Sequence, residues 1–214
     1  MDLTERKNAL RERLRVARSG LAPGRAAALG ARAAEQLAAL PEFVRAGRVA
    51  LFASLPDEID TRPLFDRARE AGKACLFPRS LPGDRLAFAL VDDWDELVPG
   101  RYGVLEPPER DIAAPLGAGD LAVLPGVAFD RRGRRLGRGR GFYDRTFAEV
   151  AGPVLVGFAA AFQVVDEVPA GPTDRPVDAI VTEVGVLWIE PGSGGGADAG
   201  RARGASTDDP GEPG

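Results

Sequence analysis

The segment from residue 121 to residue 150, LAVLPGVAFDRRGRRLGRGRGFYDRTFAEV, contains the features that decide the fold. Its first part, Leu121-Ala-Val-Leu-Pro125, is an apolar run typical of a buried strand. Its last part places Phe142, Phe147 and Val150 at helical spacing. Arginine and glycine dominate the stretch between them. The segment therefore predicts a strand, a glycine-rich turn and the start of a helix.

The turn carries six arginines and four glycines within residues 130–144, in a chain whose net charge is −4. A strand–turn–helix junction presents unpaired backbone N–H groups and the positive end of a helix dipole, and arginine adds planar forks that match phosphate oxygens. The pattern thus predicts a polyphosphate-binding loop. It is neither a Walker A loop, because no Gly-Lys-Ser/Thr follows, nor a clean dinucleotide fingerprint.

A simple surface turn is the alternative for the same stretch. Asp130 and Gly133 fit a type I turn, which needs no ligand. Such a turn leaves the alternating Gly137, Gly139 and Gly141 unexplained, because glycine costs conformational entropy and stabilises nothing by itself.

Composition restricts the chemistry. The 214 residues can bury one substantial core, and the absence of histidine excludes serine and cysteine triads and histidine-rich zinc sites. Cys75 lies in an apolar run and is expected to be a core residue. No apolar stretch approaches the roughly 18 residues that span a bilayer, and no signal-peptide core is present, so a cytoplasmic location is expected. Basic charge confined to one loop and the N-terminus of an acidic chain favours a small anionic ligand over nucleic acid.

Helical and strand patterns alternate along the chain. A first helix is expected over residues 2–19, with Asp2 and Glu5 as a capping box and Gly20 as its stop. Further helices are expected over residues 23–40 and 61–71, and strands over residues 48–53, 73–78, 86–91, 121–125, 154–158, 179–182 and 186–189. This order predicts an α/β three-layer sandwich with a mainly parallel, Rossmann-like central sheet. We expect one domain over residues 1–190 and a disordered tail over residues 191–214, which contain no large apolar side chain.

Two groups of charged residues are candidates for ligand contacts. Lys7 and Arg11 lie one turn apart on the first helix, and a solvated helix face explains them equally well. Asp57-Glu58-Ile59-Asp60 follows a predicted strand, where open α/β sheets place their ligand crevice. A loop with a helix-capping acid is the alternative there.

Three aspartates are candidates for a metal site. Asp144 lies in the first turn after the glycine loop, where it could bind Mg²⁺ that also contacts phosphate oxygens. Favourable placement near a helix N-terminus explains it without a metal. Asp174 and Asp178 flank Arg175-Pro-Val177 just before a predicted strand. Either could supply a second carboxylate, although loop acids of this kind are usually only solvated.

Taken together, these motifs resemble the 5-formyltetrahydrofolate cyclo-ligase (5,10-methenyltetrahydrofolate synthetase) family. The run Arg135-Leu-Gly-Arg-Gly-Arg-Gly-Phe-Tyr-Asp144 is a specific signature of that family when a strand precedes it. The resemblance covers nearly the whole chain before the tail. It also includes residues 7–11, 57–59, 102–107, 124–130, 176–178 and 181–183.

The resemblance implies ATP- and Mg²⁺-dependent closure of 5-formyltetrahydrofolate to 5,10-methenyltetrahydrofolate. In that family ATP phosphorylates the formyl oxygen, N10 of the folate attacks the activated carbon, and ADP and phosphate are released. This chemistry suits a chain without histidine, because phosphoryl transfer depends mainly on positioning and charge neutralisation. The implied partners are ATP and a reduced folate, with neither nucleic acid nor membrane, and the implied state is a monomer.

The resemblance also assigns residue roles. Arg138 and Arg140 would be catalytic, Glu58 would accept hydrogen bonds from the pterin, and Asp144 and Asp178 would face Mg²⁺. The residues that would contact ATP are Lys7, Arg11, Arg135, Leu136, Gly137, Arg138, Gly139, Arg140, Gly141, Phe142 and Tyr143. Those that would contact the folate are Arg11, Ala53, Glu58, Tyr102, Arg138, Gly139, Arg140, Gly141 and Phe142.

The chain departs from the family pattern at three positions. Arg140 stands where lysine is common, which keeps the charge but changes its geometry. Phe142 stands where tyrosine is common, which keeps stacking but loses a hydroxyl. Thr173 stands where many relatives have histidine.

Two other functions remain open from the residues alone. A nucleotide- or RNA-binding module could use the arginine loop without chemistry, and it would show a steep salt dependence. A divergent α/β enzyme acting on a sugar phosphate or an acyl-CoA could bind its phosphate in the same loop.

Overall fold

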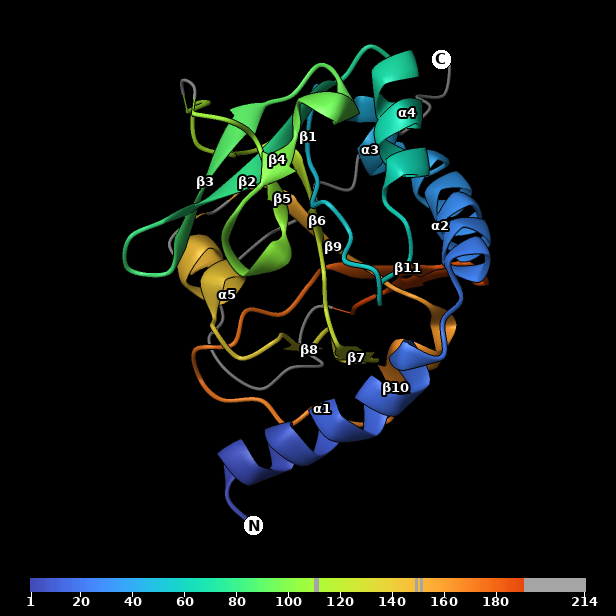
Figure 1. Ribbon diagram of the computed structural model, residues 1–214, viewed down its shortest axis with the longest axis vertical. Coiled ribbons are helices and arrows are strands. Elements are labelled where there is room, and N and C mark those ends of the chain that lie inside the picture. Colours follow the sequence, from blue (N-terminus) through green and yellow to red (C-terminus); the bar gives the residue numbers. More distant parts are fainter. Residues whose placement is uncertain (110–111, 149, 151, 191–214) are drawn as a thin grey trace, which may run out of the picture.

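The computed structural model describes residues 1–109, 112–148, 150 and 152–190, and the predicted disordered tail lies outside these residues (Figure 1). Its centre is a seven-stranded sheet with the order β12-β11-β9-β6-β1-β2-β3. The strands are β1 (Arg48–Ala50), β2 (Ala74–Leu81), β3 (Arg85–Leu90), β6 (Leu121–Leu124), β9 (Val154–Phe158), β11 (Ala179–Thr182) and β12 (Gly185–Trp188).

The middle of this sheet is parallel. β1 pairs parallel with β2 and with β6, so that Ala50 lies opposite Leu76 on one side and Ala122 on the other. β6 continues parallel to β9, and β9 to β11. The outermost pairs, β2 with β3 and β11 with β12, are antiparallel. The mainly parallel sheet predicted from the alternating patterns is confirmed.

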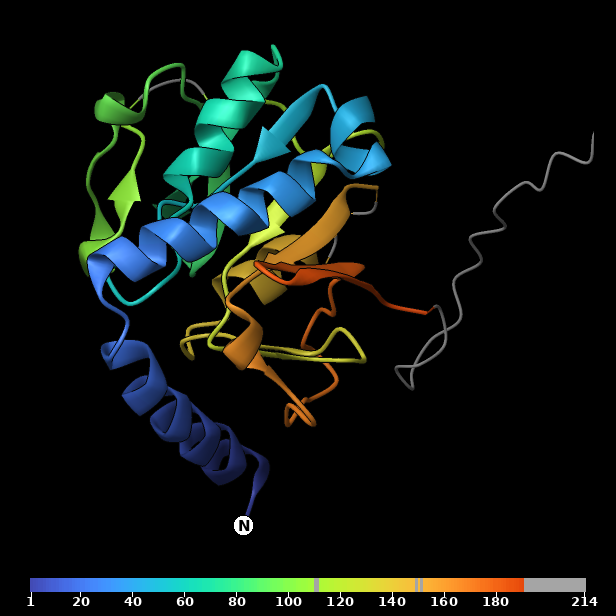
Figure 2. The ribbon, with the colours of Figure 1, turned by 90° about the vertical axis from the view of Figure 1, so that its right-hand side faces the viewer.

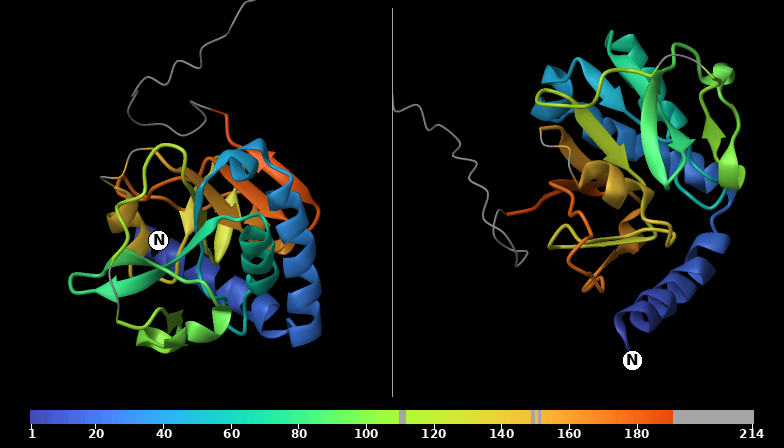
Figure 3. Two further views of the ribbon diagram at one scale, coloured as in Figure 1. Left: turned by 90° about the horizontal axis from the view of Figure 1, so that it is seen from above. Right: turned by 90° about the vertical axis from the view of Figure 1, so that its left-hand side faces the viewer.

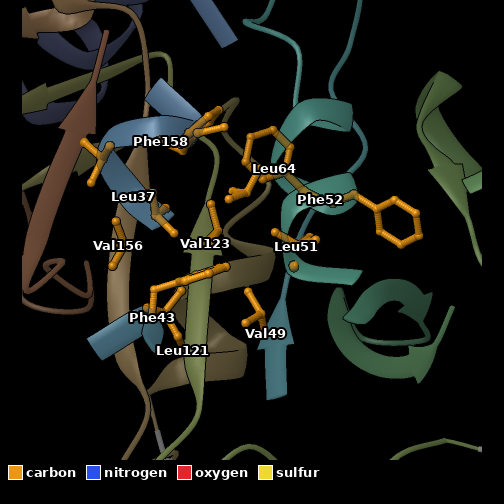
Figure 4. Packing of buried hydrophobic residues seen from close by; sticks show 14 of the residues in the cluster. Leu37, Phe43, Val49, Leu51, Phe52, Leu64, Leu121, Val123, Val156 and Phe158 are labelled. Atoms are coloured by element: carbon orange, nitrogen blue, oxygen red, sulfur yellow. The ribbon is translucent and has the colours of Figure 1, made fainter. Parts of the chain in front are cut away.

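Helices cover both faces of the sheet, as Figure 3 shows from above. One face packs against α2 (Pro23–Ala38), α3 (Pro41–Arg45) and α4 (Arg62–Glu70), and Figure 4 shows Leu37 near Val123 and Phe43 near Leu121 of β6. The other face packs against α5 (Phe142–Phe147), whose Phe147 is buried beside the opposite side chains of the same strands. The three-layer α/β fold is therefore confirmed, with a thinner second helical layer.

The N-terminal helix packs against a second, smaller sheet instead of the central one. This sheet has the order β10-β7-β8, with β7 (Ala128–Asp130), β8 (Arg135–Leu136) and β10 (Val164–Val165). Helix α1 (Leu3–Ser19) lies at the same end of the molecule as this sheet (Figure 2), and its residues Leu10 and Leu14 are buried against it. The predicted Asp2–Glu5 capping box and the stop at Gly20 are both present.

The small sheet changes the path predicted for the arginine-rich segment. The sequence predicts that the strand ending near Pro125 leads directly into the glycine turn. Instead, the antiparallel strands β7 and β8 intervene, and the Gly133 N–H donates to the Asp130 carbonyl in the turn that joins them. The predicted turn at residues 130–133 therefore exists, but it lies away from the glycine-rich run.

A short hairpin and three 3-10 segments complete the described chain. The hairpin pairs β4 (Val98–Pro99) with β5 (Leu105–Glu106) around the 3-10 segment Arg101–Gly103. The other two 3-10 segments are Trp94–Glu96 and Ala161–Gln163. No helix among the described residues has both the length and the apolar character needed to cross a membrane.

Cys75 is a core residue, as predicted. It is fully buried on β2, and burial raises the pKa of its thiol to about 11. Because the thiolate is the reactive form, this side chain is inert in the folded protein.

Gly30 is required where α2 touches the loop after β1. The Asp60 N–H donates to the Ala26 carbonyl at 3.2 Å, and a Cβ at Gly30 would lie 2.1 Å from the Asp60 oxygen. We expect Gly30→Ala to destabilise the fold by about 1–3 kcal/mol, because backbone atoms must move apart. Gly24 lies on the same helix, and a Cβ there would have no atom within 4 Å, so Gly24→Ala should instead stabilise the fold by about 0.4–1 kcal/mol. Urea unfolding of both variants checks this, and equal stabilities would contradict it.

Candidate active site

A cleft opens at the C-terminal ends of β1 and β6, where an open α/β sheet is expected to bind its ligand. It encloses about 1070 Å³ of space, including the part open to solvent. Most of the predicted site residues line it. They are Ala53, Glu58, Tyr102, Arg135, Gly137, Arg138, Arg140, Gly141, Phe142, Tyr143 and Asp144.

The glycine loop connects β8 to α5 along one wall of this cleft. Gly139 and Gly141 have φ angles of +107° and +67°, a conformation that L side chains rarely adopt, which explains why glycine alternates here. α5 contains only six residues, so it is shorter than the predicted helix. The positive charge of this wall therefore comes mainly from the arginine side chains.

Helix α1 brings Lys7 and Arg11 to the outer side of the glycine loop. The Arg11 Nε donates to the Gly137 carbonyl at 3.0 Å, and the Arg11 guanidinium lies beside Gly139. The Lys7 Nζ lies 2.6 Å from Asp174 Oδ2, with both side chains largely buried. These contacts exclude the alternative of a solvated helix face. Burial lowers the pKa of Arg11, and Asp174 opposes that shift.

Asp144 is held between the glycine loop and the segment that precedes β11. Its Oδ1 accepts from Arg135 Nη2 at 2.7 Å and from the Arg175 N–H at 3.3 Å. Arg135 is 3% exposed, and its Nε has no hydrogen-bond partner among the described residues. A buried donor without a partner in a cleft wall is a feature that a bound anion would satisfy.

The segment that precedes β11 separates the two aspartates that were candidates for a second carboxylate. Asp174 is the neighbour of Arg175, which contacts Asp144, and it also pairs with Lys7. Asp178 lies at the opposite end of the parallel strands, where its Oδ2 accepts from the Leu155 N–H at 2.8 Å. Neither Asp174 nor Asp178 lines the cleft. Asp174 is the chain neighbour of the residue whose N–H donates to Asp144, so it is a second candidate for the other carboxylate. A metal site shared by Asp144 and Asp178 stays a prediction.

Glu58 is the most heavily bonded carboxylate of the cleft. Its Oε2 accepts from the Leu55 N–H at 3.0 Å. Its Oε1 accepts from Arg138 Nη2 at 3.1 Å and from Arg18 Nη2 at 3.2 Å. Asp57 extends the network, because its Oδ1 lies 2.6 Å from the Arg138 guanidinium. Burial by itself would lower the pKa of Arg138. The attraction of Glu58 and Asp57 is larger than this effect, so the pKa of Arg138 is raised above its usual value.

Aromatic side chains line the cleft next to the glycine loop. Arg140 lies over the ring of Tyr102 at 4.1 Å from its centroid, and Tyr102 lies 6.1 Å from Phe142. Tyr102 is 54% exposed and has a φ of 61°, which is uncommon for a residue other than glycine. An exposed ring held in a strained conformation at a cleft is suited to stacking on a planar ligand.

Four predicted ATP contacts lie outside the cleft lining, for different reasons. Gly139 belongs to the loop but lies beside the Arg11 guanidinium. Lys7 and Arg11 approach the glycine loop from outside, as described above. Leu136 is a strand residue with its side chain buried beneath α1, and its carbonyl accepts from the Val127 N–H. Leu136 therefore fixes the start of the loop and does not present a side chain to a ligand.

Sequence reasoning missed Arg18, which is 3% exposed and bonded to Glu58. A signal for it exists, because Leu10, Leu14 and Arg18 are spaced four residues apart. A helix with this spacing places all three on one face. An arginine on an otherwise apolar face indicates a buried acidic partner.

The chain is similar to known cyclo-ligases over most of its length. Residues 3–183 match the model of the 5-formyltetrahydrofolate cyclo-ligase family. The 5-formyltetrahydrofolate cyclo-ligase of Escherichia coli K12 is 37% identical over 175 residues, covering 79% of this chain and 96% of its own. The NMR structure of Aquifex aeolicus 5,10-methenyltetrahydrofolate synthetase superposes with a TM-score of 0.74 at 32% identity, over 94% of this chain and 97% of its own. The corresponding Mycoplasma pneumoniae protein shares the fold, with a TM-score of 0.65 at 22% identity, over 86% of this chain and 99% of its own.

Proposed function

Because this chain belongs to the 5-formyltetrahydrofolate cyclo-ligase family and is an enzyme of that class, we propose that its cleft closes 5-formyltetrahydrofolate to 5,10-methenyltetrahydrofolate with ATP and Mg²⁺. The observation that carries the proposal is the meeting of two unlike surfaces. Basic side chains from α1 and the glycine loop adjoin a cleft that contains the exposed ring of Tyr102, the half-buried ring of Phe142 and a largely buried carboxylate. One surface suits a polyphosphate, and the other suits a pterin.

The phosphate side is formed by Lys7, Arg11, Arg135 and the glycine loop. Arg11 is fixed to the loop through the Gly137 carbonyl, so the helix and the loop act as one unit. The Arg135 Nε, which lacks a partner within the described part of the chain, supports the presence of an anion in the ligand-bound state. Fixed cations of this kind neutralise the charge that spreads over the phosphoryl oxygens during transfer.

The folate side is formed by Glu58, Ala53, Tyr102 and Phe142. Glu58 is the acceptor for the amino and ring N–H groups of the pterin, and the two aromatic rings supply stacking surface. Since Arg138 contacts Glu58 and also belongs to the glycine loop, it lies between the two sides. Arg138, together with Arg140, is therefore the group that we assign to the reacting formyl oxygen and phosphoryl group.

Asp144 with Asp174 would hold Mg²⁺. No group of three or more metal-binding side chains occurs in the described part of the chain, and Mg²⁺ requires only one or two carboxylates because water and phosphate oxygens fill its shell. When bound, the ion neutralises phosphate charge. Lys7 forms an ion pair with Asp174, and Arg135 forms one with Asp144. These two cations therefore hold the carboxylates in place.

In the proposed reaction the formyl oxygen attacks the γ-phosphorus of ATP and ADP leaves. N10 then attacks the formyl carbon and loses its proton, and the phosphate departs from that carbon with the former formyl oxygen. The substrate supplies its own nucleophile, so the protein's side chains orient the two substrates and neutralise charge. A polynucleotide is a poorer candidate, because Asp57, Glu58 and Asp144 already pair with two of the cleft arginines, Arg138 and Arg135. A monomer in the cytoplasm stays a prediction.

The test is the absorbance of methenyltetrahydrofolate on mixing the protein with 5-formyltetrahydrofolate, ATP and Mg²⁺. We expect one ADP and one phosphate for each product molecule, and no product when ATP or Mg²⁺ is left out. Product formation without ATP would contradict the proposal, as would ATP hydrolysis that does not depend on folate.

A further inference from the structure

We propose that Arg18 is a positioning residue for the folate site, which holds Glu58 and Asp57 in place while Arg138 leaves them to act on the phosphoryl group. The proposal rests on the function proposed above. It concerns a side chain of α1 that does not line the cleft.

Arg18 contacts both acids and the backbone between α1 and the cleft. Its Nε donates to the Asp57 carbonyl at 3.0 Å, and its Nη2 lies 3.2 Å from Glu58 Oε1 and 3.0 Å from Asp57 Oδ2. These contacts fix both the backbone and the carboxylates of the loop after β1. An arginine fork can make several such bonds in one plane, which a lysine cannot do.

Burying the charged side chain of Arg18 costs desolvation free energy, so its position calls for an explanation. It continues the apolar face of Leu10 and Leu14, and only 3% of its side chain is exposed. Burial lowers the pKa of Arg18, while Glu58 and Asp57 oppose that shift. Replacing a buried ion pair by apolar residues is often neutral or stabilising, so this pair is weak as a stability device. The hydrogen bond from Arg18 to Glu58, which lines the cleft, instead connects the Arg18 side chain to the ligand site.

Arg18 and Arg138 bind the same oxygen, Glu58 Oε1, but they differ in exposure. The side chain of Arg138 is 46% exposed, whereas that of Glu58 is 9% exposed. If Arg138 moves toward the phosphoryl group without Arg18 present, a nearly buried carboxylate loses the charge that balances it, which is strongly unfavourable. With Arg18 in place, Glu58 keeps one guanidinium and the Leu55 N–H. Arg18 is thus the fixed counterion, and Arg138 is the exchangeable one.

The experiment replaces Arg18 by methionine and by lysine, with Arg15→Met as the matched control. Arg15 lies on the same helix, is exposed, and pairs with Glu12. Binding of 5-formyltetrahydrofolate without ATP is measured by calorimetry, and KM is measured for each substrate. Arg18→Met should weaken folate binding roughly tenfold, a coupling typical of residues in one network. KM for ATP should change less than twofold, Arg18→Lys should lie between Arg18→Met and the wild type, and Arg15→Met should match the wild type.

A double-mutant cycle separates positioning from a general structural role. In a Glu58→Gln background the additional effect of Arg18→Met on folate binding should be less than about twofold, since the carboxylate that Arg18 holds is gone. An undiminished tenfold effect in that background would overturn the proposal, as would an equal rise in both KM values. If the wild type forms no methenyl product, the proposed function fails. If it forms product and Arg18→Met binds folate normally, only the positioning role fails.

Discussion

Arg138→Ala is expected to lower kcat by about 30- to 1000-fold, which corresponds to a loss of about 2–4 kcal/mol of transition-state stabilisation. The reason is that Arg138 belongs to the glycine loop on the phosphate side, and its guanidinium also bonds to Glu58 on the folate side of the cleft. The same range is expected for Arg140→Ala, which removes the cation over Tyr102. The fold should be retained, because Glu58 and Asp57 keep Arg18 as a partner. Steady-state kinetics and a thermal melt of each variant measure the two quantities.

Arg132→Ala is the matched control for these loop variants. Arg132 belongs to the same arginine-rich segment, but it is exposed and does not line the cleft. Its replacement should leave kcat within twofold of the wild type. Near-normal turnover in Arg138→Ala and Arg140→Ala would remove both from the catalytic machinery, whatever the control shows.

Asp144→Asn is expected to raise the Mg²⁺ concentration needed for half-maximal activity and to lower kcat by roughly 100-fold at moderate Mg²⁺. Asparagine keeps an oxygen for Arg135 but loses the charge, so a loss of stability of about 1–3 kcal/mol is also expected. Titration of activity with MgCl₂ measures the first effect, and urea unfolding measures the second. Part of the lost activity should return at high Mg²⁺.

The three aspartates give this experiment an internal comparison. Asp174→Asn should also raise the Mg²⁺ requirement, because Asp174 lies beside the residue that contacts Asp144. Asp178→Asn should leave it unchanged, since an amide oxygen can still accept from the Leu155 N–H at the far end of the strands. A raised Mg²⁺ requirement in Asp178→Asn alone would show that the assignment of the second carboxylate is wrong.

The central sheet could be predicted because its strands are continuous apolar runs. Leu121–Leu124 and Ala179–Thr182 are buried along their whole length, so each reads as a strand between turn residues. The small sheet could not be predicted in the same way. β8 contains two residues, and β7 ends in a buried aspartate that accepts from Arg134 and from the Val168 N–H. Strands this short carry no periodic pattern.

The site can be predicted where a residue lies in a local motif, and it is missed where the tertiary arrangement decides. The glycine loop follows β8 directly and Glu58 lies in the loop after β1, and the structure places both at the cleft. The choice between Asp174 and Asp178 depends on how residues 171–178 turn, with the Asp174 carboxylate accepting from the Gly171 N–H. No local pattern specifies that turn. The role of Arg18 depends on a partner that lies 40 residues away in the sequence.

The pairing of Lys7 with Asp174 joins residues 167 positions apart, and a second link joins Arg6 to Glu167. Contacts of such sequence separation close large loops, and they slow folding because the chain entropy must be lost before the contact forms. α1 precedes the rest of the domain, yet its apolar docking surface and the acidic partners of Arg6 and Lys7 arrive only with the second half of the chain. In refolding, helical structure should therefore return before activity. The phosphate-binding residues would come together only in the last step, when the first helix closes onto an otherwise completed domain.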